Sequence, residues 1–191
     1  AFWRDMRRLD RRLKLYLLVA FLFTLGNSSN TFLLLKANAV GFSDTDVVLL
    51  YFLYNLSASL LAIPFGTRSD RVGRKRVLVA GYLVFSLVYA GFAFVTSRQL
   101  LAVVFVLYGV YTAMVTGVER AFIAEIAPAN LKGTMLGLHA TLVGAALLPA
   151  SLLAGFLWQS IGSWAPFTFG AALSLAAAAV LGMGLNTRRN A

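Results

Sequence analysis

The sequence has no cysteine and only one histidine among its 191 residues. Without cysteine there is no disulfide framework, no thiol nucleophile and no thiolate metal site. One histidine is too few for a histidine-based metal centre. Charged residues are also scarce, at 13% of the chain, against roughly a quarter in a typical soluble domain. These shortages argue against a soluble globular protein and against most metalloproteins.

Catalytic patterns are missing as well. No glycine-rich phosphate-binding loop is followed by lysine and serine or threonine, so half of an ATP-driven pump is not expected. No serine, histidine and aspartate occur at one predicted depth. His139 is about one turn inside a predicted span, where we interpret it as a packing residue rather than a proton relay. We therefore expect no enzymatic activity, no cofactor and no metal.

Hydrophobic residues, in contrast, make up 60% of the chain, and its mean hydropathy is +0.79. Charged residues divide the sequence into uncharged blocks of nearly constant length, and a longer last block is divided by Gln159 to Ser163 and Pro166. About 20 apolar residues in a helix span a hydrocarbon core of about 30 Å. The pattern predicts an all-α membrane protein whose residues 14–185 form six spans, at about 14–35, 46–66, 77–96, 99–118, 134–157 and 165–185.

The cations are distributed unevenly between the two sides of this arrangement. A net charge of +10 would also suit a nucleic-acid-binding protein. However, fifteen of the 17 lysines and arginines fall on the side of the two termini, and only Lys36 and Arg98 fall on the other. The positive-inside rule then places both termini in the cytoplasm of a multi-pass protein of the cell (inner or plasma) membrane. We expect the lipid bilayer, and no nucleic acid, as a partner.

The two ends of the chain are predicted to be cytoplasmic segments. Residues 1–13 place Phe2, Met6, Leu9 and Leu13 on one helical face among arginines. Such a segment could lie in the lipid headgroup layer, and a disordered basic linker is an equal alternative. Residues 186–191 form a short tail. Because the chain opens on alanine inside a basic segment, we expect it to be cut from something longer.

Eleven residues between the second and third spans, GTRSDRVGRKR from Gly66 to Arg76, hold five cations and one carboxylate. Any cytoplasmic loop could be this basic. Their order and spacing, however, closely resemble the signature loop of the major facilitator superfamily, G-x-L-A-D-R-x-G-R-K-R. Arg68 and Ser69 depart from that pattern. The matching residues are Gly66, Asp70, Arg71, Gly73, Arg74, Lys75 and Arg76.

The run from Glu125 through Pro128 to Lys132, Gly133 and Gly137 also resembles the family's pattern before the fifth span. The resemblance implies the C-terminal half of a twelve-span secondary transporter, built as two inverted three-helix repeats. It implies an N-terminal half as partner and a small-molecule substrate held between the halves, moved by rocker-switch alternating access. Two alternatives stay open: a six-span protein that dimerises into a transporter, and a non-transporting membrane scaffold.

Several polar side chains occur at mid-depth in the spans. The first span contains Gly26-Asn27-Ser28-Ser29-Asn30, and unpaired polar groups in hydrocarbon cost several kcal/mol. Such residues must face protein or a water-filled cavity. We expect one group to form the wall of a substrate cavity, with the alternative that it merely ties helices together. Its members are Asn27, Asn30, Tyr51, Asn55, Tyr108 and Thr112.

Charged residues near the signature loop suggest a gate. Glu119 and Arg120 close the fourth span, and Glu125 follows. We favour Glu119 as an interfacial carboxylate paired with Arg74 or Arg120 over a proton carrier. By resemblance to the family, Asp70 contacts a helix end of the opposite half and helps close the cytoplasmic side. Arg74 then pairs within this half, with Glu119 or Glu125.

Overall fold

A computed structural model of the protein describes residues 11–184, which are almost entirely helical and contain no strand. Six helical segments of this part are long and apolar enough to cross a membrane. The all-α fold with six spans is thereby confirmed. Residues 1–10 of the expected basic segment and the tail 186–191 lie outside the described part. The elements are α2 (Arg11–Gly26), α3 (Thr31–Ala39), α4 (Asp44–Val72), α5 (Arg74–Phe94), α6 (Arg98–Ile126), the short η1 (Ala129–Leu131), α7 (Lys132–Ser160) and α8 (Ala165–Gly184).

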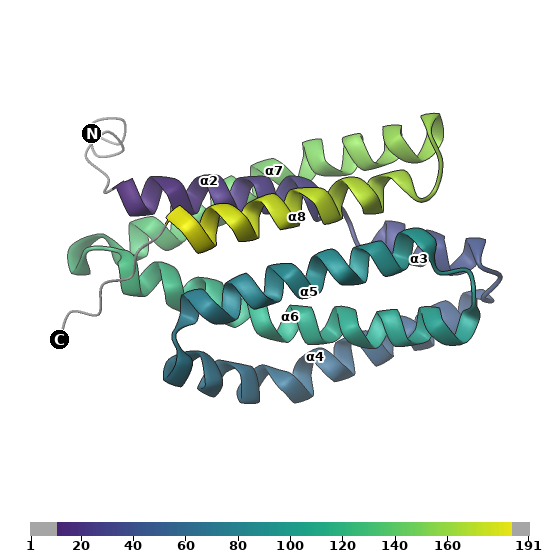
Figure 1. Cartoon of the computed structure of the whole chain (residues 1–191), viewed down its shortest axis with the longest axis horizontal. Helices are drawn as coiled ribbons and strands as arrows, with labels where there is room; N and C mark the ends of the chain where they lie inside the picture. The colour runs from purple at the N-terminus through teal and green to yellow at the C-terminus, as the bar shows by residue number, and fades with distance from the viewer. Residues whose placement is uncertain (1–10, 185–191) are drawn as a thin grey trace.

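Together α2 and α3 form the first span, and successive spans run in opposite directions (Figure 1). The start of α2 and the end of α8 therefore lie at the same end of the bundle, here called the terminal end. The opposite end is called the far end. Several helices are longer than the expected spans: α4, α6 and α7 each have 29 residues. At 1.5 Å per residue these are about 43 Å long, so they protrude from a hydrocarbon core of about 30 Å.

The signature segment, expected as a loop, is helical except at one residue. The α4 helix continues to Val72 and α5 begins at Arg74. Gly73 between them has φ of 98°, a conformation that glycine adopts without steric cost. Arginine and lysine are good helix formers, so the charges continue the two helices beyond the membrane. Gly73 alone makes the sharp turn between them.

The six spans interlock as two groups of three. The first group is α2/α3, α4 and α5, and the second is α6, α7 and α8. In each group the second helix packs against the first helix of the other group: α4 against α6, and α7 against α2. The third helix of each group also packs against the first helix of the other group: α5 against α6, and α8 against α2. In addition, α5 and α8 pack on each other. Since three spans reverse the chain's direction, the groups are two inverted repeats (Figure 1).

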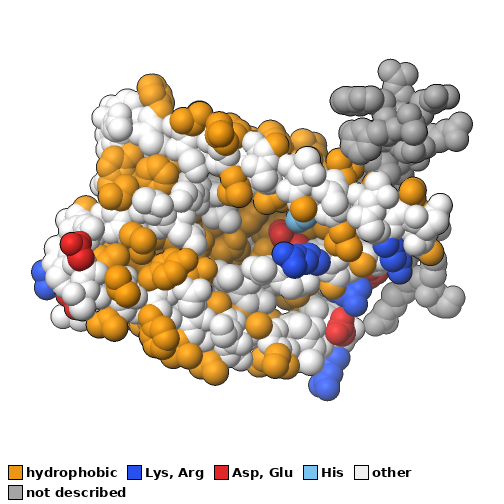
Figure 2. Space-filling view, turned by 180° about the vertical axis from the view of Figure 1, so that it is seen from behind, with side chains coloured by type: hydrophobic (Ala, Val, Ile, Leu, Met, Phe, Trp, Pro, Cys, Tyr) orange, Lys and Arg blue, Asp and Glu red, His pale blue; other side chains and the backbone are white. Residues whose placement is uncertain are grey.

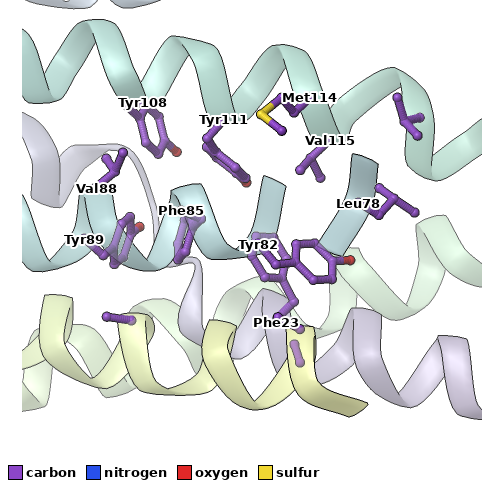
Figure 3. Close-up of a cluster of buried hydrophobic side chains, with 14 of the residues drawn as sticks. Phe23, Leu78, Tyr82, Phe85, Val88, Tyr89, Tyr108, Tyr111, Met114 and Val115 are labelled. Carbon is purple, nitrogen blue, oxygen red and sulfur yellow. The ribbon is translucent and has the colours of Figure 1, made fainter. Parts of the chain in front are cut away.

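The aromatic core lies where α2, α5 and α6 meet (Figure 3). On α5, Tyr82, Phe85 and Tyr89 are fully buried. The ring of Phe23 from α2 stacks on Tyr82 at 4.2 Å between centroids, and Tyr111 of α6 meets Phe85 edge-on at 4.8 Å. These stacked and edge-to-face contacts are favourable aromatic geometries. They fix the relative positions of the three helices that carry the polar groups described below.

In contrast, α4 and α7 form two exposed ridges. Ile63 on α4 is 77% exposed and Leu148 on α7 is 68% exposed. Each of these helices contains one internal proline, Pro64 or Pro149. Helices whose apolar side chains are this exposed are expected to meet lipid or another protein surface. The two ridges flank one face of the molecule, and that face carries the candidate site.

Candidate functional site

The first span is interrupted near its middle. Helix α2 ends at Gly26 and α3 begins at Thr31, so residues 27–30 are not helical. Asn and Ser favour such irregular backbone because their side chains bond to nearby backbone groups instead of supporting a helix. Gly26 itself packs closely on α8, where its backbone oxygen lies against Gly170. The segment 27–30 is hereafter called the break.

Three tyrosines hold the break in place. The amide nitrogen of Asn27 donates a hydrogen bond of 3.1 Å to the Tyr111 hydroxyl, and Tyr89 donates one of 3.3 Å to Asn27 Oδ1. The Tyr108 hydroxyl donates to Asn30 Oδ1 at 2.9 Å. Figure 3 shows Tyr108 and Tyr111 of α6 pointing toward α5, the helix that carries Tyr89. The network satisfies polar groups that would otherwise be costly inside the bundle.

The break also opens into a hollow. Two residues of α7, Leu147 and Ser151, complete its wall together with the four residues of the break, and its volume is about 370 Å³. Figure 2, seen from behind, shows this face hollowed between an upper ridge and a lower one. These ridges are α7 and α4, by their places in Figure 1. A polar, irregular segment of backbone at mid-depth thus lines an open space.

The six residues expected to form a cavity wall are only partly brought together. Asn27, Asn30 and Tyr108 meet through the network just described. Tyr51 is 39% exposed and reaches Tyr108 only through Tyr54, with ring centroids 5.2 and 5.0 Å apart. The exposed Asn55 donates to the Tyr51 carbonyl on its own helix, and the half-buried Thr112 donates to the Tyr108 carbonyl.

Three participants were not expected from the sequence: Tyr89, Tyr111 and Ser151. Tyr89 lies seven residues after Tyr82 on an otherwise apolar helix, so the two share a face of α5. A buried tyrosine hydroxyl requires a partner, and that requirement was the available signal. Ser151 gave no comparable signal, because the sequence around it in α7 is apolar on all sides.

Arg74 joins three helices at the terminal end. Its guanidinium contacts Asp70 Oδ1 at 3.0 Å, near the end of α4, and Glu125 Oε2 at 3.0 Å on α6. It also donates to the Ala121 carbonyl at 3.1 Å. The neighbouring Lys75 donates to the Gly182 carbonyl of α8 at 2.8 Å. Residues of the signature segment thus tie α4, α5, α6 and α8 together.

The other charged candidates are placed differently from expectation. Glu119 accepts a hydrogen bond of 2.9 Å from the Tyr82 hydroxyl, and no salt bridge joins it to Arg74 or Arg120 among the described residues. The expected ion pair of Glu119 is therefore absent, because Arg74 is held by other carboxylates. Arg120 is exposed, as are Arg71 and Arg76, whereas Gly66 is half-buried within α4. Residues 11–184 contain no group of histidine and acidic side chains suited to a metal ion.

Comparison with known proteins agrees with this architecture. The family model described as Major Facilitator Superfamily matches residues 16–190. An uncharacterized MFS-type transporter of Methanocaldococcus jannaschii is 37% identical over 181 residues, covering 92% of this chain and 45% of that protein. The arabinose-proton symporter of Escherichia coli K12 is 29% identical over 109 residues, 57% of this chain and 23% of that protein. The quinolone resistance protein NorA of Staphylococcus aureus is 25% identical over 138 residues, 72% of this chain and 35% of that protein. The matched region of this chain covers about half the length of the first of these relatives and a smaller share of the other two.

Proposed function

The chain belongs to the major facilitator superfamily, and from that premise we propose that it supplies the C-terminal half of a secondary transporter that moves a small solute across the cell membrane. Its six spans and two inverted repeats are those of one half in this fold. The relatives that it matches are about twice as long or longer, which supports a second, N-terminal half as its partner. A second copy of the same chain is the alternative partner.

One observation carries the proposal: the break lies at mid-depth and lines a hollow on the face between the α4 and α7 ridges. A broken helix inside a membrane is tolerated only where protein or a water-filled cavity surrounds it. Asn27 and Asn30 are bonded to tyrosines, so they serve mainly to shape the wall. Ser29 and Ser151, which are half-buried and line the hollow, are then the groups that would meet a solute, whereas Ser28 is only 6% exposed.

We further propose that the terminal end is cytoplasmic and that the α4 and α7 ridges meet the other half. The positive-inside distribution supports the first statement. The exposed apolar side chains of both ridges support the second, because the hollow between them would be closed by a partner on the same face. Rocking of one half against the other would then open the hollow to each side in turn.

Thiol labelling tests the proposal directly, because this chain has no native cysteine. In the longer protein, made cysteine-free, Ser29→Cys and Ser151→Cys should react with a membrane-impermeant thiol reagent through the water-filled hollow, because both residues are half-buried and line it. Leu87→Cys on α5 is the matched control, since Leu87 is 68% exposed but away from the hollow, and it should stay unreacted. Reaction from both sides of the membrane is expected for alternating access. No reaction at either serine would favour the non-transporting scaffold.

Flux through reconstituted vesicles is the complementary measurement. Arabinose and a quinolone are the first probes, because the names of two relatives refer to these compounds. Transport is expected from this chain together with an N-terminal half. Transport from this chain alone would instead favour a dimer of six-span proteins.

A further inference from the structure

Helix α8 lies behind the wall of the hollow. Among residues 11–184 that wall is formed by the break and by two residues of α7, and α8 contributes no residue to it. Instead, α8 packs along α2 and α5 (Figure 1). At one residue, Gly170, it nevertheless touches both the end of α2 and the tyrosine of α5 that holds the break. A helix outside the wall is thus in contact with the parts that support it.

The backbones of α2 and α8 meet at two glycines. A Cβ atom on Gly170 would overlap the carbonyl oxygen of Gly26, and a Cβ on Gly26 would lie 3.0 Å from the carbonyl oxygen of Gly170. Gly26 is the last residue of α2, and Asn27, the first residue of the break, follows it directly. A displacement of the Gly26 backbone would therefore be passed on to Asn27.

Gly170 also leaves room for the ring of Tyr89. A Cβ on Gly170 would lie 2.7 Å from Cδ1 and 2.8 Å from Cε1 of that ring. The ring has little space to retreat, because it is fully buried, stacks on Phe85 at 3.9 Å between centroids and meets Phe167 edge-on at 5.6 Å. Close-packed interiors transmit such displacements. Since the Tyr89 hydroxyl donates to Asn27 Oδ1, this second path ends at the same residue of the break.

Helix α8 is fastened at this level by two buried hydrogen bonds. Ser86 of α5 donates to the Ala171 carbonyl at 3.0 Å, and Ser174 donates to the Tyr82 carbonyl of α5 at 2.7 Å. Ala171 and Ser174 lie within about one turn of Gly170. Moving α8 away from the break would leave these buried polar groups unpaired, which is costly. A side chain at position 170 would therefore displace the break more readily than α8.

We propose that Gly170 is a positioning residue for the solute site. Its lack of a side chain allows α8 to support Asn27 along two paths, the Gly26 backbone and the Tyr89 ring, and so sets the shape of the hollow without meeting the solute. The inference rests on the proposed function for its effect on transport, and not for the shape of the hollow itself.

The shape of the hollow is tested in the full-length, cysteine-free protein carrying Ser29→Cys, by the rate of its reaction with a membrane-impermeant thiol reagent. Gly170→Ala should change this rate about three- to tenfold, the size expected when one hydrogen bond is lost. Gly182→Ala is the matched control on the same helix, because a Cβ there meets nothing within 4 Å, and it should leave the rate unchanged. An unchanged rate in Gly170→Ala would overturn the proposal.

A second substitution at the same contact covers the case in which Gly170→Ala does not fold. Gly26→Ala places its Cβ 3.0 Å from backbone and side-chain atoms of α8, which is a milder overlap. It should change the Ser29→Cys rate in the same direction by a smaller factor. If Gly170→Ala fails to fold and Gly26→Ala leaves the rate unchanged, the positioning role is refuted.

General loosening of the bundle is distinguished by a glycine away from the break. A Cβ on Gly81 of α5 would press on Val115 and Met114 of α6, about 12 Å along α5 from Tyr89. Gly81→Ala should lower the thermal stability in detergent, as Gly170→Ala does, yet keep the Ser29→Cys rate of the wild type. An equal change of rate in both variants would mean that Gly170 serves packing alone.

The path through Tyr89 is tested by a double-mutant cycle on the same rate. Tyr89→Phe keeps the ring and removes the bond to Asn27. If both substitutions act on Asn27, the double variant Gly170→Ala/Tyr89→Phe should change the rate by less than the product of the two single changes. Changes that multiply would contradict convergence on Asn27.

Transport in proteoliposomes, with arabinose and a quinolone as probes, tests the effect on the solute. Gly170→Ala should raise the KM of a transported probe about three- to tenfold with little change in kcat, because the wall is displaced while the other helices keep their packing. A lower kcat at unchanged KM would overturn this role. If neither probe moves in the wild type, that outcome counts against the proposed function alone, and the thiol rates still decide whether Gly170 positions the break.

Discussion

The Tyr108 hydroxyl donates a 2.9 Å hydrogen bond to Asn30 Oδ1, although 78 positions separate the two residues in the sequence. The bond joins the first helix of one inverted repeat to the first helix of the other. It fixes the outer end of the break, as Tyr89 and Tyr111 fix its inner end through Asn27. The wall of the proposed solute site is therefore shaped by contacts between the repeats.

Removing that hydroxyl should destabilise the protein. In Tyr108→Phe, Asn30 Oδ1 loses its donor inside the bundle, and the free energy of unfolding should fall by about 1–3 kcal/mol. Thermal unfolding in detergent measures the change. Tyr51→Phe is the control, because Tyr51 is partly exposed and its change should stay within about 0.5 kcal/mol. Equal effects of the two substitutions would contradict a structural role for the Tyr108 bond.

Two glycines of α6 should respond oppositely to the same substitution. A Cβ on Gly109 would overlap Ser57 Oγ and the Tyr54 carbonyl of α4, whereas a Cβ on Gly117 would meet nothing within 4 Å. Gly109→Ala should separate α6 from α4 and lower the free energy of unfolding by about 1–3 kcal/mol. Gly117→Ala should raise it by about 0.5–1 kcal/mol, because alanine is the better helix former. Chemical denaturation of the two variants in parallel checks both signs, and a destabilised Gly117→Ala would show that the space there is not open.

The signature segment allows a test of the gate. Asp70 and Glu125 each contact Arg74 at 3.0 Å and both are exposed, so each pair contributes only about 0.2–1 kcal/mol within this half. If Asp70 also contacts the opposite half, Asp70→Asn should shift the equilibrium between the two conformations further than the loss of the Arg74 pair alone would. A loss of about 1.4 kcal/mol changes the ratio of the two populations about tenfold. Glu125→Gln is the matched control. Transport rate and thiol accessibility at the cytoplasmic side are the measurements, and identical behaviour of the two variants would exclude the gate.

Asp70 is also not positioned to cap the third span. It lies within the last turn of α4, three residues before Gly73, and α5 begins only at Arg74. If Asp70→Asn leaves transport unchanged, the reason would be that the ion pair is weak. Asparagine replacing aspartate as an N-cap of α5 would not explain it.

Topology can be checked with exposed positions at the two ends. Arg71→Cys should be labelled only from the cytoplasm and Gln99→Cys only from outside, because fifteen of 17 cations are predicted on the cytoplasmic side. Ser69 in the same segment is only 2% exposed, so it is unsuitable as a labelling position. Reversed access at either of the two cysteines would contradict the orientation.

Sequence reasoning succeeded where the signal is local. Uncharged blocks of about 20 residues predicted six spans, and the run from Gly26 to Asn30 stood out as polar at mid-depth, although the break in the helix there was not predicted. The partners of those residues could not be predicted, because Tyr89 and Tyr111 lie 62 and 84 positions from Asn27. Nothing in one sequence specifies which of several buried tyrosines meets a given asparagine.

Glu119 shows the same limit. The sequence predicted an ion pair for Glu119, but its hydrogen-bond donor is Tyr82, 37 positions away. Charge complementarity favoured Arg74 or Arg120 as partner, and the sequence could not show that Arg74 is already held by Asp70 and Glu125. The helical continuation of the signature segment was missed for a simpler reason. Charged residues end a hydrophobic span without ending a helix.

The interlocked packing of the repeats has a consequence for synthesis. When the ribosome has delivered α2 to α5, the principal partner of α4 is α6, which has not yet been made, and α2 still lacks α7 and α8. The first three spans therefore leave the translocon without their native neighbours. Their final arrangement must wait for the second three, which makes the six-helix bundle, and not the three-helix repeat, the smallest part of this chain able to fold.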